Sequence, residues 1–209
     1  MAESYLVPAG YGEGRYEDRK SKFIGDLYFV ESQEQAIELL NEVKAKYRDA
    51  RHHCYAYIIR EGNYMRYSDD GEPQGTAGMP MLDVLRRENL TNVLCVVTRY
   101  FGGVLLGTGG LVRAYSHGAK IAVDAASRKL MTTCVLLGME FDYSFYGKIN
   151  YLLPKYVCRV EESDFGALVQ MKILFKQTEV EAFLKEVTEL SAALVVPQVL
   201  EERFDYFEA

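Results

Sequence analysis

The stretch that decides the fold runs from Val93 to Tyr115 and reads V-L-C-V-V-T-R-Y-F-G-G-V-L-L-G-T-G-G-L-V-R-A-Y. Its first five residues are all apolar, which predicts a strand buried on both faces. The five glycines that follow predict a loop whose backbone is free to approach a ligand. Apolar residues then recur at helical spacing, so we expect a helix from about Leu111 to Lys129. These three elements form the centre of the first domain.

The glycine-rich loop is the strongest candidate binding site in the sequence. Its glycines leave backbone N–H groups unobstructed, and the N-terminus of the next helix carries a partial positive charge that suits phosphate. The candidates for binding an anion or RNA are Arg99, Tyr100, Gly102, Gly103, Gly107, Gly109, Gly110 and Arg113. The spacing matches neither a dinucleotide fingerprint nor a Walker loop. A tight strand-to-helix connection, in which glycine only permits close packing, is the alternative interpretation.

A second loop, from Ser68 to Pro80, reads S-D-D-G-E-P-Q-G-T-A-G-M-P. Long loops in compact domains are usually functional. Its acidic candidates are Asp69, Asp70 and Glu72. Three carboxylates in four residues could hold a divalent cation, but the spacing matches no calcium loop, and we expect no metal here. The favoured interpretation is an acidic turn beside the glycine-rich loop, where its carboxylates balance Arg99 and Arg113.

Charge is divided unevenly along the chain. The 209 residues carry 24 Lys and Arg against 30 Asp and Glu. Residues 1–133 hold 17 of each kind, and residues 134–209 hold 7 cations and 13 acids, so the whole net charge of −6 lies in the last third. This balance excludes a strongly basic protein and argues against the last third as a nucleic-acid surface, but it leaves a local basic patch open in the first part.

The pattern of predicted strands and helices in the last third indicates a second domain. Its order of strand, helix, strand, strand, helix and strand is the ferredoxin-like arrangement. Within it we expect a strand over residues 135–143, a helix over residues 148–153, a turn over residues 163–166, a second helix capped by Thr178 and a final strand from Leu194. The sequence therefore predicts an α+β protein with two domains, residues 1–131 and 132–209.

Cysteine usage and the absence of signal segments indicate the compartment. The four cysteines, Cys54, Cys95, Cys134 and Cys158, lie far apart and mostly inside apolar runs. This pattern predicts buried free thiols in a reducing environment, not disulfides or a zinc site. No apolar run approaches the ~18 residues that a membrane span needs. The first ten residues have no basic start or apolar block of a secretion signal. We therefore expect a cytoplasmic protein.

No catalytic constellation is visible. His52 and His53 are adjacent in a predicted strand, so their rings point to opposite faces and cannot share a ligand. His117 follows Arg113 by one helical turn, and we interpret all three histidines as structural or surface residues. No nucleophile lies in a recognised motif. We expect no catalytic residue and no cofactor.

Two long segments, residues 67–80 and 92–115, closely resemble the YigZ/IMPACT family. The segments R-K-S-K-F-I at 19–24 and H-C-Y-A-Y at 53–57 are also similar to that family. The acidic last domain resembles the domain appended in bacterial members, and the RWD domain of eukaryotic members is not present in this sequence. The resemblance implies that the first domain has the fold of the second domain of a small-ribosomal-subunit protein. The last domain is expected to be similar to the final domain of elongation factor G.

The family resemblance also bears on function, because eukaryotic members regulate translation through the kinase pathway that senses amino-acid starvation, a stress response. The leading hypothesis is therefore a non-enzymatic module that binds RNA, the ribosome or a translation-associated protein. The first alternative is an enzyme or nucleotide-binding protein that holds a small phosphorylated ligand on the glycine-rich loop, with Asp69 or Asp70 on Mg²⁺. The second is a protein-binding scaffold with a peptide site between the loops. Bacterial members have no settled activity, and fold kinship alone assigns none.

Overall fold

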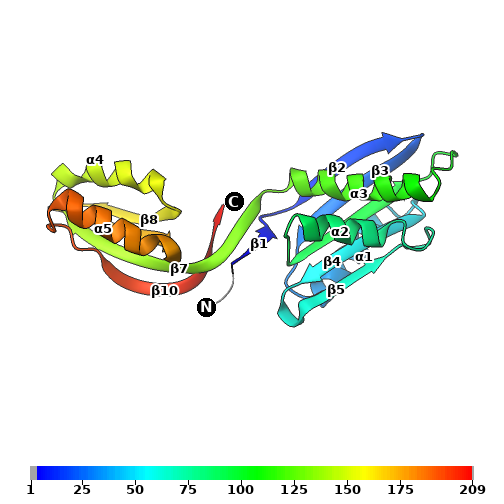
Figure 1. Cartoon of the computed structure of the whole chain (residues 1–209). Coiled ribbons are helices and arrows are strands. Elements are labelled where there is room, and N and C mark those ends of the chain that lie inside the picture. The colour runs from blue at the N-terminus through cyan, green and yellow to red at the C-terminus, as the bar shows by residue number, and fades with distance from the viewer. Residues whose placement is uncertain (1–3, 209) are drawn as a thin grey trace. The chain divides into compact units, whose positions relative to one another are not determined.

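The computed structural model describes residues 4–208 and divides into two compact units (Figure 1). The N-terminal unit consists of residues 5–129 and the C-terminal unit of residues 130–207. The division falls inside strand β7 (Arg128–Phe141). Both units combine helices with a β-sheet, which confirms the α+β class. None of the helices formed by residues 4–208 is long and apolar enough to cross a membrane.

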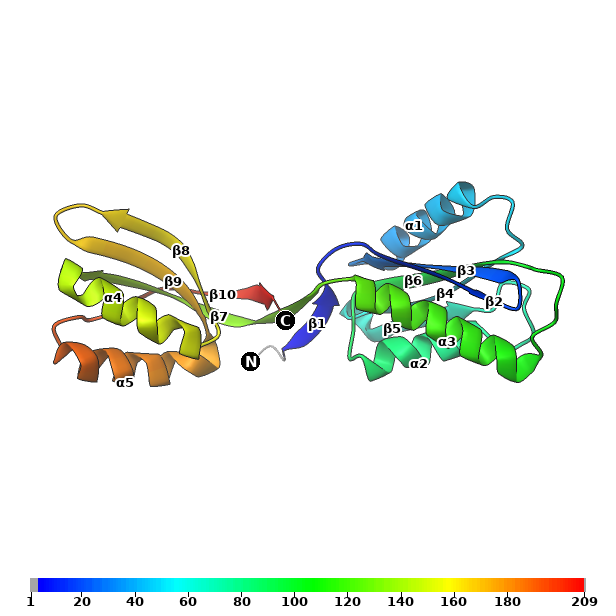
Figure 2. The ribbon, with the colours of Figure 1, turned by 90° about the horizontal axis from the view of Figure 1, so that it is seen from above.

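The N-terminal unit is an antiparallel sheet with helices on both faces. The strand order is β2-β3-β6-β4-β5. The elements of the unit are β1 (Tyr5–Pro8), β2 (Gly12–Asp18), β3 (Ser21–Phe29), α1 (Gln33–Lys46), β4 (His52–Ile59), the short 3₁₀ turn Glu61–Asn63, β5 (Tyr64–Ser68), α2 (Gly78–Arg87), β6 (Val93–Tyr100) and α3 (Thr108–Ala125). Helix α1 covers one face of the sheet, and α2 and α3 cover the other (Figure 2).

Strand β6 lies in the middle of this sheet, between β3 and β4. Leu94 and Val96 pack with α1 residues, while Val93, Cys95 and Val97 pack on the opposite face with α2 and α3. All five side chains are fully buried. The continuous apolar run therefore forms a strand buried on both faces, as the sequence predicts.

Helix α3 begins earlier and ends earlier than its apolar pattern predicts. It starts at Thr108 because Gly107, with a φ of 72°, turns the chain into the helix, so Gly109 and Gly110 form part of its first turn. It ends at Ala125, and the backbone N–H of Ala126 closes it on the carbonyl of Val123 at 3.3 Å. Residues 128 and 129, expected in the helix, are the first residues of β7.

The C-terminal unit has the ferredoxin-like strand order. Its elements are β7, α4 (Tyr143–Leu152), the 3₁₀ turn Leu153–Lys155, β8 (Cys158–Phe165), β9 (Val169–Lys176), the 3₁₀ turn Gln177–Glu179, α5 (Val180–Ser191) and β10 (Gln198–Glu208). The sheet order is β10-β7-β9-β8, and β1 is also hydrogen-bonded to β7. Both helices pack on one face over a core built around Leu137, Phe175 and Phe183, which are fully buried.

Four boundaries in this unit differ from the sequence-based expectation. Tyr143 starts α4 and does not end the preceding strand, because the Asp142 carboxylate caps the helix by accepting from the Ser144 N–H at 2.9 Å. The β8–β9 turn lies at residues 166–168. Thr178 lies in the 3₁₀ turn before α5 and does not cap that helix. The last strand starts after Pro197, since residues 192 and 193 take a left-handed conformation and end α5.

All four cysteines are free, which confirms the prediction of unpaired thiols. Cys54, Cys95 and Cys134 are buried, and Cys158 is partly buried. Burial raises the pKa of the Cys54 and Cys95 thiols, so these two stay protonated and unreactive.

Candidate functional site

The C-terminal end of β6 places Arg99 between two neighbouring strands. Its register partners are Phe23 on β3 and His52 on β4. Its guanidinium lies 5.6 Å from the centre of the Phe23 ring and 5.3 Å from that of Phe101. The side chain is only 5% exposed. Arg99 is therefore enclosed at the sheet end and does not project into solvent.

Arg99 is the centre of a buried hydrogen-bond network. Its Nη1 donates to Oε1 of Glu72 at 2.7 Å, and its Nη2 donates to the Ser21 hydroxyl at 3.3 Å. The Tyr115 hydroxyl donates to the same Glu72 oxygen at 2.7 Å, and burial raises the pKa of that phenol. The network joins the acidic loop to β6, β3 and α3. These bonds hold the acidic loop in place and engage Nη1 and Nη2 of Arg99, while its buried Nε has no hydrogen-bond partner among the described residues.

Asp69 organises the acidic loop from inside. Its carboxylate accepts from the backbone N–H groups of Gly75, Ala77 and Gly78 at 2.8 to 2.9 Å, and the last two begin α2. A Cβ at Gly78 would come within 2.8 Å of the Ser68 backbone, so only glycine fits there. Both carboxylate oxygens of Asp69 are therefore engaged by backbone N–H groups, and these hydrogen bonds hold the loop in place.

Asp70 faces α1 and the start of β4. Its carboxylate accepts from the His53 backbone N–H at 2.7 Å and lies 3.7 Å from Lys44 Nζ. The His52 ring is hydrogen-bonded to the Asp70 carbonyl at 2.9 Å. The expected balance between the acidic loop and both arginines therefore holds for Glu72 and Arg99 only. Within residues 4–208, no cluster of His, Cys, Asp or Glu has the composition to hold a metal ion.

The glycine-rich loop passes from β6 to α3 against the β2–β3 hairpin. The Gly102 N–H donates to the Ser21 hydroxyl at 3.2 Å, and a methyl group at Gly102 would overlap the Lys20 backbone. Gly103 has a φ of 82°, which favours glycine. The Tyr100 hydroxyl donates to Asp49 at 2.8 Å. The loop therefore needs glycine for its packing as well as for its backbone conformation.

The first turn of α3 offers free backbone donors. Gly107 precedes the helix, no side chain caps it, and the first N–H groups of a helix have no acceptor within it. Arg113 is exposed and makes no ion pair with any residue that the structure describes. Its Nη1 lies 3.7 Å from the position of a Cβ on Gly109, so the guanidinium folds back over this turn. His117 packs edge-on against Tyr16, with ring centres 4.6 Å apart.

Further cations that the sequence reasoning did not assign to the site lie at the same end of the N-terminal unit. Arg19 and Lys20 form the β2–β3 turn on which Gly102 packs. We call the cations at this end the cationic end: Arg19, Lys20, Lys22, Arg48, Arg51 and Arg113. All six are exposed, and none has an ion-pair partner among residues 4–208. Arg19, Lys20 and Lys22 form the R-K-S-K segment of the sequence, but only strand register shows that this segment meets the glycine-rich loop.

Comparison with known proteins shows to which family the chain belongs. The model for the Impact N-terminal domain matches residues 19–123, and a domain of unknown function, DUF1949, matches residues 139–193. An IMPACT family member of Haemophilus influenzae is 37% identical over 204 residues, covering 96% of this chain and 98% of the relative. The chain belongs to the IMPACT family. The region of this chain that matches the Impact N-terminal domain contains the Arg99 network, both loops and the start of α3.

Other IMPACT relatives match over nearly their whole length. The IMPACT family member YigZ of Escherichia coli is 34% identical over 203 residues, covering 96% of this chain and 100% of the relative. A crystal structure of a hypothetical protein is 33% identical, with a TM-score of 0.60 over 97% of this chain and 100% of the solved chain. The two-domain arrangement is therefore shared with bacterial IMPACT proteins.

Proposed function

We propose that this IMPACT protein is a non-enzymatic cytoplasmic module that binds RNA through its cationic end and thereby regulates translation on the ribosome. The observation that carries the proposal is that six exposed cations, none with an ion-pair partner among residues 4–208, lie at the end of the N-terminal unit where the uncapped helix α3 begins. Phosphate contacts supply most of the affinity of a protein for nucleic acid. The role in translation rests on the family resemblance.

Local charge supports an RNA surface even though residues 1–133 are neutral in sum. Each of the three acids of the acidic loop already has a partner. Glu72 pairs with Arg99, and Asp69 accepts from backbone N–H groups. Asp70 lies near Lys44 and accepts from the His53 N–H. The remaining acids at this end are Glu17, Asp18 and Asp49, and Asp49 accepts from Tyr100. Cations therefore exceed acids where the glycine-rich loop reaches the surface.

The glycine-rich loop also presents aromatic and apolar surface. Phe101 is 46% exposed, and Leu105 is 80% exposed. An exposed ring beside cations stacks on unpaired bases, which is how proteins read single-stranded RNA. We therefore expect single-stranded or looped RNA to bind more tightly than a duplex.

The test is a titration of a labelled single-stranded RNA against wild type and the double variant Arg19→Ala/Lys20→Ala, both in an exposed turn. We expect about tenfold weaker binding by the variant and a salt dependence that is less steep by about one unit of slope. The matched control is Arg86→Ala/Arg87→Ala, which removes two exposed cations at the C-terminal end of α2. This control should bind as wild type does.

A second candidate ligand is a small phosphorylated molecule held by the N–H groups of the first turn of α3 and by Arg113. Such a ligand makes few phosphate contacts, so its affinity should fall only weakly with salt, and Arg113→Ala should matter more than Arg19→Ala/Lys20→Ala. Binding of nucleotides with that profile, and no binding of RNA, would replace the RNA proposal. Failure of both ligands to bind would contradict a phosphate-reading role for this surface.

A further inference from the structure

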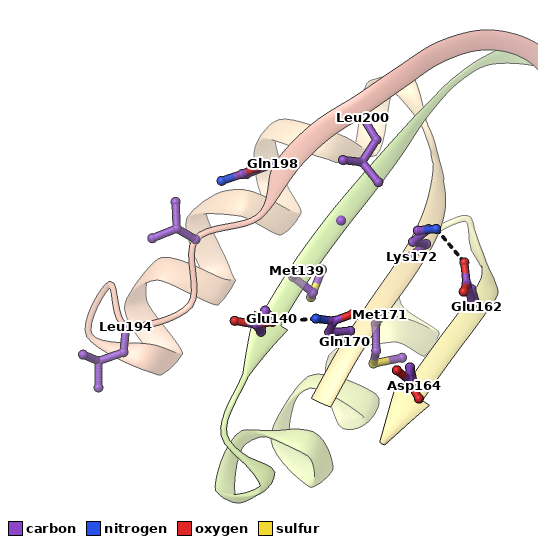
Figure 3. Close-up of a pocket in the computed structure, with 12 residues that line it drawn as sticks. Met139, Glu140, Glu162, Asp164, Gln170, Met171, Lys172, Leu194, Gln198 and Leu200 are labelled. Carbon is purple, nitrogen blue, oxygen red and sulfur yellow. Dashed lines mark hydrogen bonds and ion pairs between the residues drawn. The ribbon is translucent and has the colours of Figure 1, made fainter. Parts of the chain in front are cut away.

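The sheet of the C-terminal unit has one face without a helix, and a groove lies on it (Figure 3). Strand register places two rows of residues across this face. Glu140 on β7, Gln170 on β9 and Asp164 on β8 form one row, and Gly138, Lys172 and Glu162 form the next. The alternate residues Met139 and Met171 point into the core under the helices. The groove volume is about 530 Å³, within the range of typical binding sites.

The groove floor is negative. It contains three carboxylates and a single cation. Lys172 lies 2.6 Å from Glu162 and so neutralises that acid. Glu140 accepts only an amide hydrogen bond from Gln170 at 2.6 Å, and no ion pair to Asp164 is formed by the residues that the structure describes. Two carboxylates without a cation therefore flank Gln170 in the same row.

One wall of the groove is apolar and exposed. Leu194 is 75% exposed, Val196 is 67% exposed and Leu200 is 50% exposed. Leu200 covers Gly138, whose missing side chain leaves room for it: a Cβ there would lie 2.8 Å from Leu200 Cδ1. Exposed aliphatic groups grouped beside a polar floor are typical of interaction sites and not of free surfaces.

The segment that carries this wall is held in place. Ala192 and Ala193 both have left-handed backbones, with φ of 50° and 62°, a conformation that is unfavourable for alanine. Val195 is fully buried, and its N–H donates to the Ser191 hydroxyl at 3.2 Å. Because Val195 is buried, the side chains of its two neighbours, Leu194 and Val196, are held on the solvent-exposed side of the segment. The apolar wall is therefore preorganised, which lowers the entropic cost of binding.

We propose that this groove binds a short basic segment of a partner protein, with its lysine or arginine side chains on Glu140 and Asp164 and its aliphatic side chains against Leu194, Val196 and Leu200. Charge complementarity selects this occupant, because the groove and the whole acidic C-terminal unit attract a polycation and repel RNA. This inference is independent of the RNA surface, since it concerns other residues in the other unit.

The experiment measures binding of a labelled peptide that alternates lysine and leucine to the full-length protein by fluorescence anisotropy. The charge variant is Glu140→Lys/Asp164→Lys, which turns two attractions into repulsions. The apolar variant is Leu194→Ser/Val196→Ser, which changes only exposed side chains. We expect each variant to weaken binding about tenfold or more. Binding by wild type should weaken as salt is raised.

The matched control is Glu181→Lys/Glu189→Lys, which makes the same charge change at exposed positions of α5, on the opposite face of the sheet. Retained binding by this control supports the groove. An equal loss in the control, no binding by wild type, or binding unaffected by the apolar variant would overturn the proposal. Displacement of the peptide by a single-stranded RNA in wild type and in Arg19→Ala/Lys20→Ala alike would also overturn it, because it would make the groove an RNA site.

Discussion

The two units handle charge in opposite ways. The N-terminal unit buries one ion pair, Arg99 with Glu72, whose side chains are both 5% exposed, and the six cations of its cationic end have no ion-pair partner among residues 4–208. The ion pairs of the C-terminal unit are exposed, as in Lys155 with Glu186, or partly exposed, as in Arg203 with Asp205, and two carboxylates in its groove have no cation among the described residues. The net charge of a unit therefore does not show which of its charges are available at the surface. What decides the partner of each unit is which charges are already satisfied inside the protein.

The largest expected effect is the removal of one whole unit. A fragment of residues 130–209 should retain the helices and strands of the C-terminal unit and unfold cooperatively, because its core is contained within the unit. A fragment starting at Cys134 lacks the first residues of β7, including buried Thr132, and should be less stable. Circular dichroism during thermal unfolding of both fragments measures this. A longer fragment that aggregates or lacks structure would show that the units are not independent.

Breaking the buried ion pair tests the difference between the units directly. Arg99→Met leaves Glu72 buried without its cation, so we expect a loss of about 3–5 kcal/mol in the free energy of unfolding. The same change at Lys155, whose single ion pair with Glu186 is exposed, should cost about 1 kcal/mol or less. Hydrogen exchange should report lower protection in residues 5–129 for Arg99→Met only.

The double variant Arg99→Met/Glu72→Leu removes both charges and serves as the control for the ion pair. It should recover part of the lost stability, since no unpaired charge stays buried. Equal losses for Arg99→Met and Lys155→Met would contradict the distinction between buried and surface pairs.

Alanine at one glycine in each unit gives a smaller effect. At Gly102 the new methyl group meets the Lys20 backbone, which cannot move aside, so we expect a loss of about 1–3 kcal/mol and weaker RNA binding. At Gly138 it meets the end of the flexible Leu200 side chain, and we expect less than about 1 kcal/mol. Denaturant unfolding of the two variants measures the difference. A smaller cost at Gly102 than at Gly138 would show that the glycine-rich loop is not fixed on the hairpin.

The smallest effect concerns thiol reactivity and leaves stability unchanged. Cys158 is the partly buried cysteine, and burial, with Glu179 nearby, raises its pKa to about 11. Near neutral pH its labelling should be slow, and the rate should rise with pH until the thiol ionises near that value. The other three cysteines should react only after denaturation, when four thiols are counted. Rapid native labelling of Cys54 or Cys95 would indicate that the N-terminal core opens readily.

Sequence reasoning succeeded where a local pattern reports burial. The apolar run at residues 93–97 and the order of elements in the last third were both readable from short segments. Sequence reasoning failed to locate the ends of helices and strands that are set by a single capping group or by the conformation of one or two residues. Asp142 caps a helix that begins at Tyr143, and residues 192 and 193 delay the last strand, because caps and left-handed residues leave no periodic signal.

The sequence by itself determined the two-domain α+β architecture, the free cysteines and the two loops that carry the family resemblance, because these follow from periodicity and spacing along the chain. Only the tertiary structure decided which charges remain available. Glu72 reaches Arg99 because the acidic loop packs against the end of β6, and Lys20 meets the glycine-rich loop because β3 pairs with β6. Ion pairing depends on strand order and register, which join residues far apart in sequence. That is why Arg99, one of the phosphate candidates in the sequence, lies buried, while Arg19, Lys20 and Lys22 of the R-K-S-K segment are exposed.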